Sequence, residues 1–286
     1  DHIVMQMIKH RRQYAAMVSQ YCLTILTLLI GTSCTRTPDE KTLEITGSST
    51  VAPLVAEIAK EFETLNPSFR VNVQTGGSSR GISDTIKGTA DIGMVSRRLH
   101  KNEQHLESYT LAHDGIGIIT HSDVDLKNLS SDNIRKVFTG SYKSWNELSK
   151  NEKKITVVHK AQGRSTSELF IKYFDLKYSD VKAHIIIGDN EQGIKNVSNI
   201  PGAIGYVSIG AAESAIKSGV AIRLLKLDGA IPSSKTVAQG KYPILRPLNL
   251  VIKNNNNAAA LKFIKFAQSK KAFDIVRKLD FVPNAI

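Results

Sequence analysis

The sequence predicts an α/β fold with mainly parallel strands, divided into two lobes. Strand-like and helix-like segments alternate over residues 43–95 and again over 130–207, which is typical of helices packed on a parallel sheet. Two apolar strand-like segments, 115–120 and 245–252, bracket the second of these regions. Such segments are expected where the chain crosses to a second lobe and later returns. We therefore predict one lobe made of 43–117 with 246–286, and another made of 118–245.

In the first alternating region, apolar side chains recur at helical spacing in the predicted helices and alternate with polar ones in the predicted strands. Asn66-Pro67 ends the first helix, and Gly88 stops the second. The expected elements are a strand at 43–46, a helix at 52–65, a strand at 70–75, a helix from Ile82 to Gly88, a strand at 91–95 and a polar helical stretch at 101–108.

The same criteria apply to the rest of the chain. After the apolar strand at 115–120, a second α/β region begins near Ser130. The expected elements are helices at 132–138 and 168–174, strands at 155–158, 184–187, 201–207 and 245–253, and a terminal helix at 258–279.

Length and composition fit a globular protein with two modest domains, at 286 residues with 41% hydrophobic and 22% charged residues. The net charge of +12 fits three kinds of partner: nucleic acid, an anionic membrane surface or a small anionic ligand. Nucleic acid fits least well, because the basic residues are spread along the chain and do not interleave with aromatic residues as in known binding modules. We therefore expect no nucleic-acid partner.

The first 34 residues have the layout of an export signal. Basic residues near Lys9 precede a mostly apolar run from Tyr14 to Ile30, and Gly31-Thr32-Ser33 then precedes Cys34. A small-residue triplet that ends in Cys resembles a bacterial lipoprotein cleavage site, so we expect lipid on Cys34; plain cleavage and an uncleaved anchor are the alternatives. The expected location is the periplasm or the extracytoplasmic face of a membrane.

The segment that follows this leader reads as a tether. Residues 35–42 are polar and contain a proline. From Thr35 onward the sequence contains no cysteine, which excludes a disulfide framework, a cysteine-ligated zinc site or a thiol nucleophile there.

Three short loops are rich in glycine and hydroxyl residues, and each precedes a predicted helix. A helix N-terminus exposes unpaired N–H groups and a partial positive charge, while serine and threonine add hydroxyl donors. One such loop on its own is explained by helix capping, but three of them favour a small tetrahedral oxyanion held by several loops. The loops are Gly47-Ser48-Ser49-Thr50, Gly76-Gly77-Ser78-Ser79-Arg80-Gly81 and Gly163-Arg164-Ser165-Thr166.

An ordered set of motifs covers nearly all of 43–286 and resembles the phosphate-binding proteins of high-affinity phosphate ABC transporters. This resemblance implies the two-lobed periplasmic-binding-protein fold of class II, with phosphate held in a cleft that closes between the lobes. It also implies a monomer that delivers phosphate to membrane permease subunits and uses no cofactor. The motifs are ITGSSTVAPL (45–54), the GGSSRG loop, GTADIGMVSRRL (88–99), AHDGIGII (112–119), VFTGSYKSWNEL (137–148), IPGAIGYVS (200–208), KYPILRPL (241–248) and LDFVP (279–283).

The resemblance also places candidate ligand-binding residues. Arg164 stands where many family members have serine, and Lys160 stands where the family has arginine, which loses a bidentate contact to phosphate. Ser96 stands where some members have a selective carboxylate, so the discrimination of phosphate from sulfate is open. The full set implied is Ser49, Thr50, Ser78, Ser96, Arg97, Lys160, Arg164, Ser165 and Thr166.

An enzyme is the less favoured interpretation. The eight histidines show no metal-ligand spacing, and neither a dinucleotide-binding loop nor a P-loop is present. His159 is the one histidine near a candidate loop. We therefore expect no catalytic residues and no metal. The alternatives to phosphate binding are capture of another oxyanion (sulfate, molybdate or tungstate), or a surface lipoprotein that acts as an adhesin or sensor.

Overall fold

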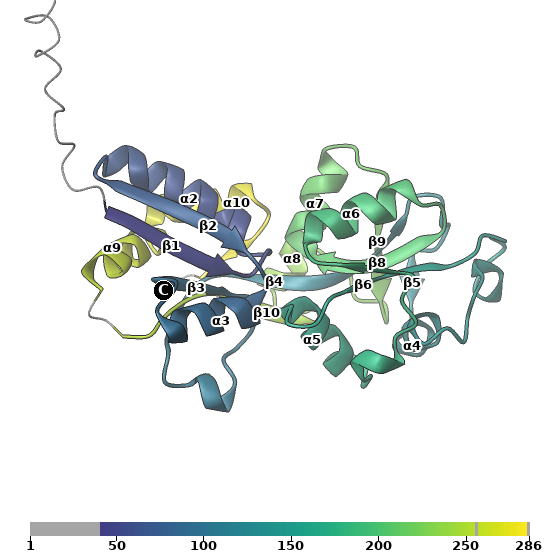
Figure 1. The fold of residues 1–286 in the computed structure, drawn as a ribbon. Coiled ribbons are helices and arrows are strands. Elements are labelled where there is room, and N and C mark those ends of the chain that lie inside the picture. The colour runs from purple at the N-terminus through teal and green to yellow at the C-terminus, as the bar shows by residue number, and fades with distance from the viewer. Residues whose placement is uncertain (1–40, 255–256, 285–286) are drawn as a thin grey trace, which may run out of the picture. The chain divides into compact units, whose positions relative to one another are not determined.

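Strand β4 (Glu107–His121) runs through both halves of the fold and joins them. The computed structural model describes residues 41–254 and 257–284. The first part of β4 pairs antiparallel with β10 (Leu245–Ile252), and its second part pairs antiparallel with β8 (Ala203–Ser208) and β9 (Ile222–Leu227) (Figure 1). Through β4, the strands of the described residues form one hydrogen-bonded network. Its main path runs in the order β2 (Phe69–Thr75), β1 (Lys41–Gly47), β3 (Ile92–Val95), β10, β4, β8, β6 (Thr156–Lys160) and β7 (Ile185–Ile187).

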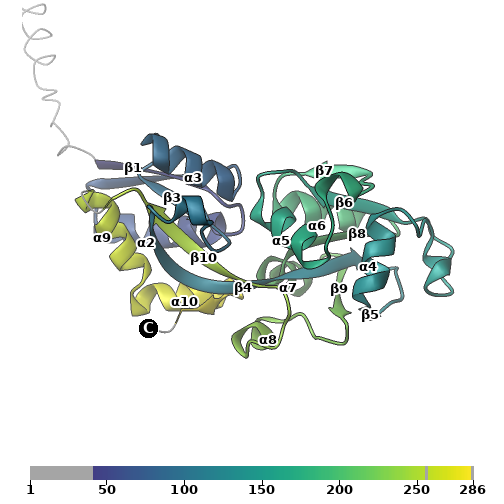
Figure 2. The same cartoon turned by 90° about the horizontal axis from the view of Figure 1, so that it is seen from below.

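The first lobe is built on β1 (Lys41–Gly47), which pairs in parallel with β2 (Phe69–Thr75) and β3 (Ile92–Val95). Phe62 lies in its core, with its ring centroid 5.2 Å from those of both Phe69 and Phe263. Helices lie on both sides of this sheet (Figures 1 and 2). They are α2 (Ala52–Leu65), α3 (Ser78–Lys87), α9 (Ala258–Ala267) and α10 (Lys270–Lys278).

The second lobe has its own aromatic core. The rings of Phe170 and Tyr206 stack with centroids 3.8 Å apart, and the buried Trp145 donates its indole N–H to the Gly202 carbonyl at 2.8 Å. Its remaining elements are β5 (Asn128–Leu129), α4 (Ser131–Phe138), β6 (Thr156–Lys160), α5 (Ser165–Tyr173), β7 (Ile185–Ile187), α6 (Asn190–Asn199), α7 (Ile209–Lys217) and α8 (Ser234–Ala238).

The chain changes from one core to the other within β4 and beside β10. Ala112 packs in the core of the first lobe and Ile116 in that of the second; Ile244 and Leu248 show the reverse change on the returning strand. Near the end of the described chain, β11 (Val282–Pro283) pairs with β4 at His113 and Ala112. Two neighbouring antiparallel strands therefore connect the lobes, and residues at this crossing belong to both.

Some predicted elements are wrong in detail. A short 3-10 helix, η1 (Lys101–Glu103), and the start of β4 replace the polar helix expected at 101–108. The terminal helix expected at 258–279 is two helices, because Ser269 caps α10 through its side chain. Helices α3 and α5 begin inside the glycine- and serine-rich loops rather than after them.

The structure describes only part of the amino-terminal region for which predictions were made. Lys41 and Thr42, expected in the tether, already belong to β1 and pair with Phe69 and Arg70. The expected leader, including Cys34, lies outside the described residues. Within the part of the chain that the structure describes, no helix is long and apolar enough to cross a membrane.

Gly47, the glycine of the first loop, should be difficult to replace. Its φ is +135°, a Cβ there would lie 2.3 Å from the Met94 carbonyl oxygen, and its own carbonyl accepts the N–H groups of Gly76 and Gly77 at 2.9 Å. Gly240 has φ +65° but open space around the Cβ position. Strain in backbone regions that only glycine favours costs about 1–3 kcal/mol, and the backbone clash at Gly47 adds to it.

We therefore expect Gly47→Ala to lower the free energy of unfolding more than Gly240→Ala, by at least about 1 kcal/mol. Urea denaturation of both variants and the parent measures this difference. Equal losses in the two variants would show that the close approach of β1 to β3 does not constrain Gly47.

Candidate anion-binding site

The three glycine- and hydroxyl-rich loops meet at one edge of the sheets. Gly47 ends β1, Thr75 ends β2, Val95 ends β3 and Lys160 ends β6. Ligands of open α/β proteins bind beyond the carboxyl ends of strands. The helices that follow the three loops begin at this same edge, so their free N–H groups lie there.

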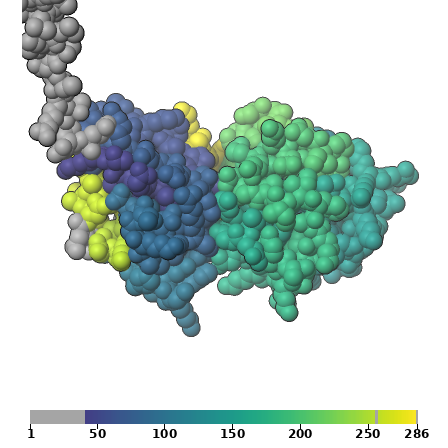
Figure 3. Space-filling model, in the orientation of Figure 1, coloured from purple at the N-terminus to yellow at the C-terminus, as the bar shows by residue number. Residues whose placement is uncertain are grey.

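Four buried serines, the serine cluster, join these loops across the two lobes. Ser48 Oγ donates to Ser96 Oγ at 2.8 Å, Ser96 Oγ lies 2.5 Å from Ser165 Oγ, and Ser78 Oγ donates to Ser165 Oγ at 3.0 Å. Ser165 comes from the second lobe and the other three come from the first. In the space-filling view the atoms of the two lobes meet along a seam (Figure 3), and each serine is at most 3% exposed.

A buried ion pair lies beside the serine cluster. Arg246 of β10 and Asp114 of β4 are direct cross-strand partners, and Arg246 Nη2 and Nε lie 2.8 Å and 3.1 Å from Asp114 Oδ2. The same guanidinium donates from Nη1 to Thr166 Oγ1 at 2.8 Å and from Nη2 to Thr50 Oγ1 at 3.1 Å. Arg246 therefore connects hydroxyl groups from the first and the third loop.

Lys160 is the second buried cation. Its Nζ donates to Asn190 Oδ1 at 2.6 Å, and Asn190 Nδ2 donates to Thr50 Oγ1 at 3.0 Å. Burial, assisted by the positive charges of Arg246 and Arg164, lowers the pKa of Lys160 to about 7, although the charges of Asp189 and Asp114 oppose the shift. A bound anion would stabilise the charged form of this lysine.

The arrangement provides donors for an oxyanion. The buried carboxylate among these groups, Asp114, is paired with Arg246, whereas the hydroxyl groups both donate and accept hydrogen bonds. No group of three histidine, cysteine, aspartate or glutamate side chains within the described ranges is arranged to hold a metal ion.

His159 does not join the site. It precedes Lys160 on β6, and successive side chains of a strand point to opposite faces. Its Nδ1 lies 2.7 Å from Tyr206 Oη, its ring packs on Tyr178, and burial lowers its pKa to about 4. It is therefore a neutral core residue.

The structure brings together six of the nine residues implied by the resemblance: Thr50, Ser78, Ser96, Lys160, Ser165 and Thr166. In the first loop, Ser48 occupies the serine cluster instead of Ser49, whose side chain is half-buried. Arg164 turns to Asp189, with Nη1 3.0 Å from Oδ1.

Arg97 differs from the expectation that it faces the ligand. Its Nη1 and Nη2 donate to the two oxygens of Glu103 at 2.7 Å and 2.9 Å, and its Nε lies 3.1 Å from Glu168 Oε2. Burial on its own lowers the pKa of Arg97, but the hydrogen bonds and charges of Glu103 and Glu168 outweigh it and raise that pKa. Its guanidinium is thus already committed to two carboxylates.

Sequence reasoning missed Arg246, Asp114 and Asn190. Arg246 stands in the apolar segment predicted as a strand at 245–252, and Asp114 immediately precedes the one predicted at 115–120. A charged residue in or beside such a strand is the signal that sequence reasoning could have used. Asn190 lies at the start of α6, where an asparagine has an ordinary capping interpretation.

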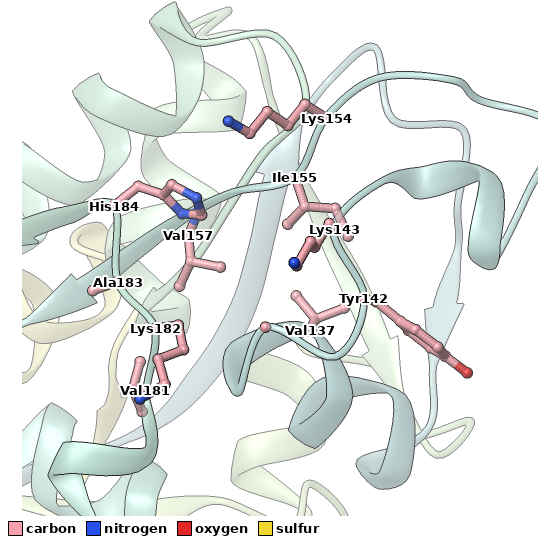
Figure 4. Close-up of a pocket in the computed structure, with 11 residues that line it drawn as sticks. Val137, Tyr142, Lys143, Lys154, Ile155, Val157, Val181, Lys182, Ala183 and His184 are labelled. Carbon is pink, nitrogen blue, oxygen red and sulfur yellow. The ribbon is translucent and has the colours of Figure 1, made fainter.

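A separate cavity of about 510 Å³ lies in the second lobe and is lined by other residues (Figure 4). Ile155, immediately before β6, and Val157, near its start, line this cavity, whereas Lys160 reaches the anion-binding edge from the end of that strand. The cavity has an apolar floor and a rim of exposed Lys143, Lys154 and Lys182. It is therefore distinct from the serine cluster.

Comparisons with known proteins agree with this geometry. A sequence model described as a PBP superfamily domain matches residues 32–271. The phosphate-binding protein PstS of Bacillus subtilis is 31% identical over 233 residues, which cover 80% of this chain and 75% of that protein. The PstS protein of Borreliella burgdorferi is 28% identical over 277 residues, covering 90% and 97%.

Solved structures give the same result. A putative phosphate ABC transporter substrate-binding protein from Clostridium perfringens, solved with bound phosphate, superposes with a TM-score of 0.79 at 28% identity, covering 86% of this chain and all of that one. The chain therefore belongs to the PBP superfamily, with the two-lobed periplasmic-binding fold of the PstS phosphate-binding proteins.

Proposed function

We propose that this protein binds inorganic phosphate reversibly, as the substrate-binding component of a phosphate ABC importer. The observation that carries the proposal is the convergence of Arg246, Lys160 and the serine cluster at the ends of the strands. The relatives named phosphate-binding protein PstS, and the structural relative with bound phosphate, support the same ligand.

In this proposal Arg246 supplies the principal charge for the anion. The Nη1 and Nη2 groups that now donate to Thr166 and Thr50 would turn to two phosphate oxygens, whose spacing a guanidinium matches, while Asp114 holds Arg246 in place. Thr50, Thr166 and the serine cluster add neutral donors, and Lys160 balances the second negative charge. These contacts come from both lobes, so binding favours closure.

The protein would act without turnover and outside the cytoplasm. After cleavage of the leader before Cys34, lipid on that cysteine would hold the protein at the membrane, where a monomer delivers phosphate to the permease subunits. We retain 43–117 with 246–286, and 118–245, as the proposed moving lobes. The proposed tether is shortened from 35–42 to 35–40, because Lys41 and Thr42 belong to β1. The serine hydroxyl groups can accept hydrogen bonds from protonated phosphate, which sulfate cannot donate.

Titration calorimetry of the purified protein with phosphate, sulfate and molybdate tests the ligand. We expect saturable binding of one phosphate and sulfate binding weaker by about 5- to 150-fold, as roughly 1–3 kcal/mol is lost when a buried polar group stays unpaired. Tighter binding of sulfate or molybdate would assign a different oxyanion. Sustained release of phosphate from phosphomonoesters would contradict the absence of turnover.

Arg246→Lys should weaken phosphate binding by about 10- to 100-fold, because lysine keeps the charge but loses the planar pair of donors. Thr166→Val should weaken it less, by about fivefold, since a neutral hydrogen bond contributes about 1 kcal/mol. Arg277→Lys is the matched control, because Arg277 forms an exposed pair with Asp274. Calorimetry that gives parental affinity for Arg246→Lys would remove Arg246 from the site.

Lys160 should make phosphate affinity depend on pH. The pKa of Lys160 is lowered from 10.5 to about 7, so above about pH 7 this lysine is mostly neutral in the free protein. Lys160 must then take up a proton before its positive charge can interact with a bound anion. The affinity ratio of the parent to Lys160→Met should therefore be greatest below about pH 7 and fall by up to about tenfold per pH unit above it.

Comparing the parent with Lys160→Met cancels the ionisation of phosphate itself. Lys154→Met, a change at an exposed lysine near the other end of β6, should leave the pH profile unchanged. A parent-to-Lys160→Met ratio that is constant from about pH 6 to about pH 9 would show that Lys160 does not titrate in this range.

A further inference from the structure

A second set of contacts joins the lobes at residues that do not belong to the serine cluster. Glu168 lies in the first turn of α5 in the second lobe. Its Oε2 lies 3.1 Å from Arg97 Nε, and its Oε1 lies 2.6 Å from His100 Nε2, both in the first lobe. One carboxylate thus contacts two side chains across the seam between the lobes.

The partners of Glu168 are held in place by their own lobe. Glu103 accepts two hydrogen bonds from Arg97 and one from the backbone N–H of His100, the last at 2.8 Å. These contacts span only three to six residues of the chain, so they persist whether or not the lobes separate. The contacts of Glu168 are different, because they are broken whenever the lobes move apart.

We propose that Glu168 is a latch that stabilises the closed arrangement of the lobes through Arg97 and His100. The effect of the latch on phosphate release rests on the proposed function, in which closure of the lobes retains bound phosphate. Arg97 is 3% exposed, whereas Glu168 and His100 are 38% and 47% exposed. The latch therefore lies at the rim of the seam, where water reaches the carboxylate and keeps its contribution modest.

A latch of this kind acts on populations. Closing brings Glu168 to Arg97 and His100, so these contacts stabilise the closed arrangement relative to the open one whether or not phosphate is bound. A variant without the carboxylate should open more often, and bound phosphate should leave faster. The substitution would leave the proposed phosphate donors in place, because the Glu168 side chain is bonded to Arg97 and His100 and not, among the described residues, to the serine cluster, Arg246 or Lys160.

The backbone provides a direct measure of opening. Ser79 N–H donates to the Gly163 carbonyl of the other lobe at 3.3 Å, and it lies in the first turn of α3, where a helix offers no internal acceptor. Its hydrogen exchange therefore reports separation of the lobes rather than unfolding of the helix.

The experiment compares the parent with Glu168→Gln, with Asp132→Asn as the matched control. Asp132 is an exposed carboxylate in the first turn of α4, and its ion pairs are with Arg135 and Lys136 of its own helix. We expect Ser79 exchange at saturating phosphate, and the release of radiolabelled phosphate, to be about three- to tenfold faster in Glu168→Gln only. His100→Gln should accelerate phosphate release less in the Glu168→Gln background than it does in the parent.

Unchanged Ser79 exchange and phosphate release in Glu168→Gln would overturn the latch, as would an equal effect of Asp132→Asn. Failure of the proposed function gives a different result, since phosphate would then leave Ser79 exchange of the parent unaltered. In that case the comparison of Ser79 exchange without phosphate still decides the latch: faster exchange in Glu168→Gln supports it, and equal exchange overturns it.

Discussion

The paired Arg246 and Asp114 are the constraint on which the remaining site depends. They face each other on β10 and β4, where the chain passes between the lobes, and both side chains are at most 1% exposed. A buried ion pair is costly unless its remaining hydrogen-bonding positions are satisfied. Thr50 and Thr166 supply two acceptors, so burial of this pair links the crossing strands, the first loop and the third loop.

The cationic side chains near the seam have distinct roles. Lys160 is buried among neutral donors and acceptors, and Arg246 donates to the hydroxyl groups of two loops as well as to its partner Asp114. Arg97 and Arg164 are paired with carboxylates away from the serine cluster. A net charge of +12 for the chain therefore does not describe the site itself. The local balance leaves Lys160 weakly basic, and an anion would restore its positive charge.

Sequence reasoning identified what is encoded locally and missed what depends on register. Glycine followed by hydroxyl residues before a helical pattern located all three loops, and the helix at 52–65 was confirmed. The Arg246–Asp114 pair spans 132 residues and depends on the alignment of two strands with a register shift at Leu248. Likewise, the contact of Arg97 with Glu168 joins residues of two lobes, which no local pattern indicates.

The most direct test of the account is the location of the anion. We would crystallise the protein with arsenate, a tetrahedral analogue of phosphate, and locate the arsenic by its anomalous scattering. The account predicts one strong peak enclosed by Arg246, Thr166 and the serine cluster. A peak instead among Lys143, Lys154 and Lys182, in the cavity of the second lobe, would contradict it.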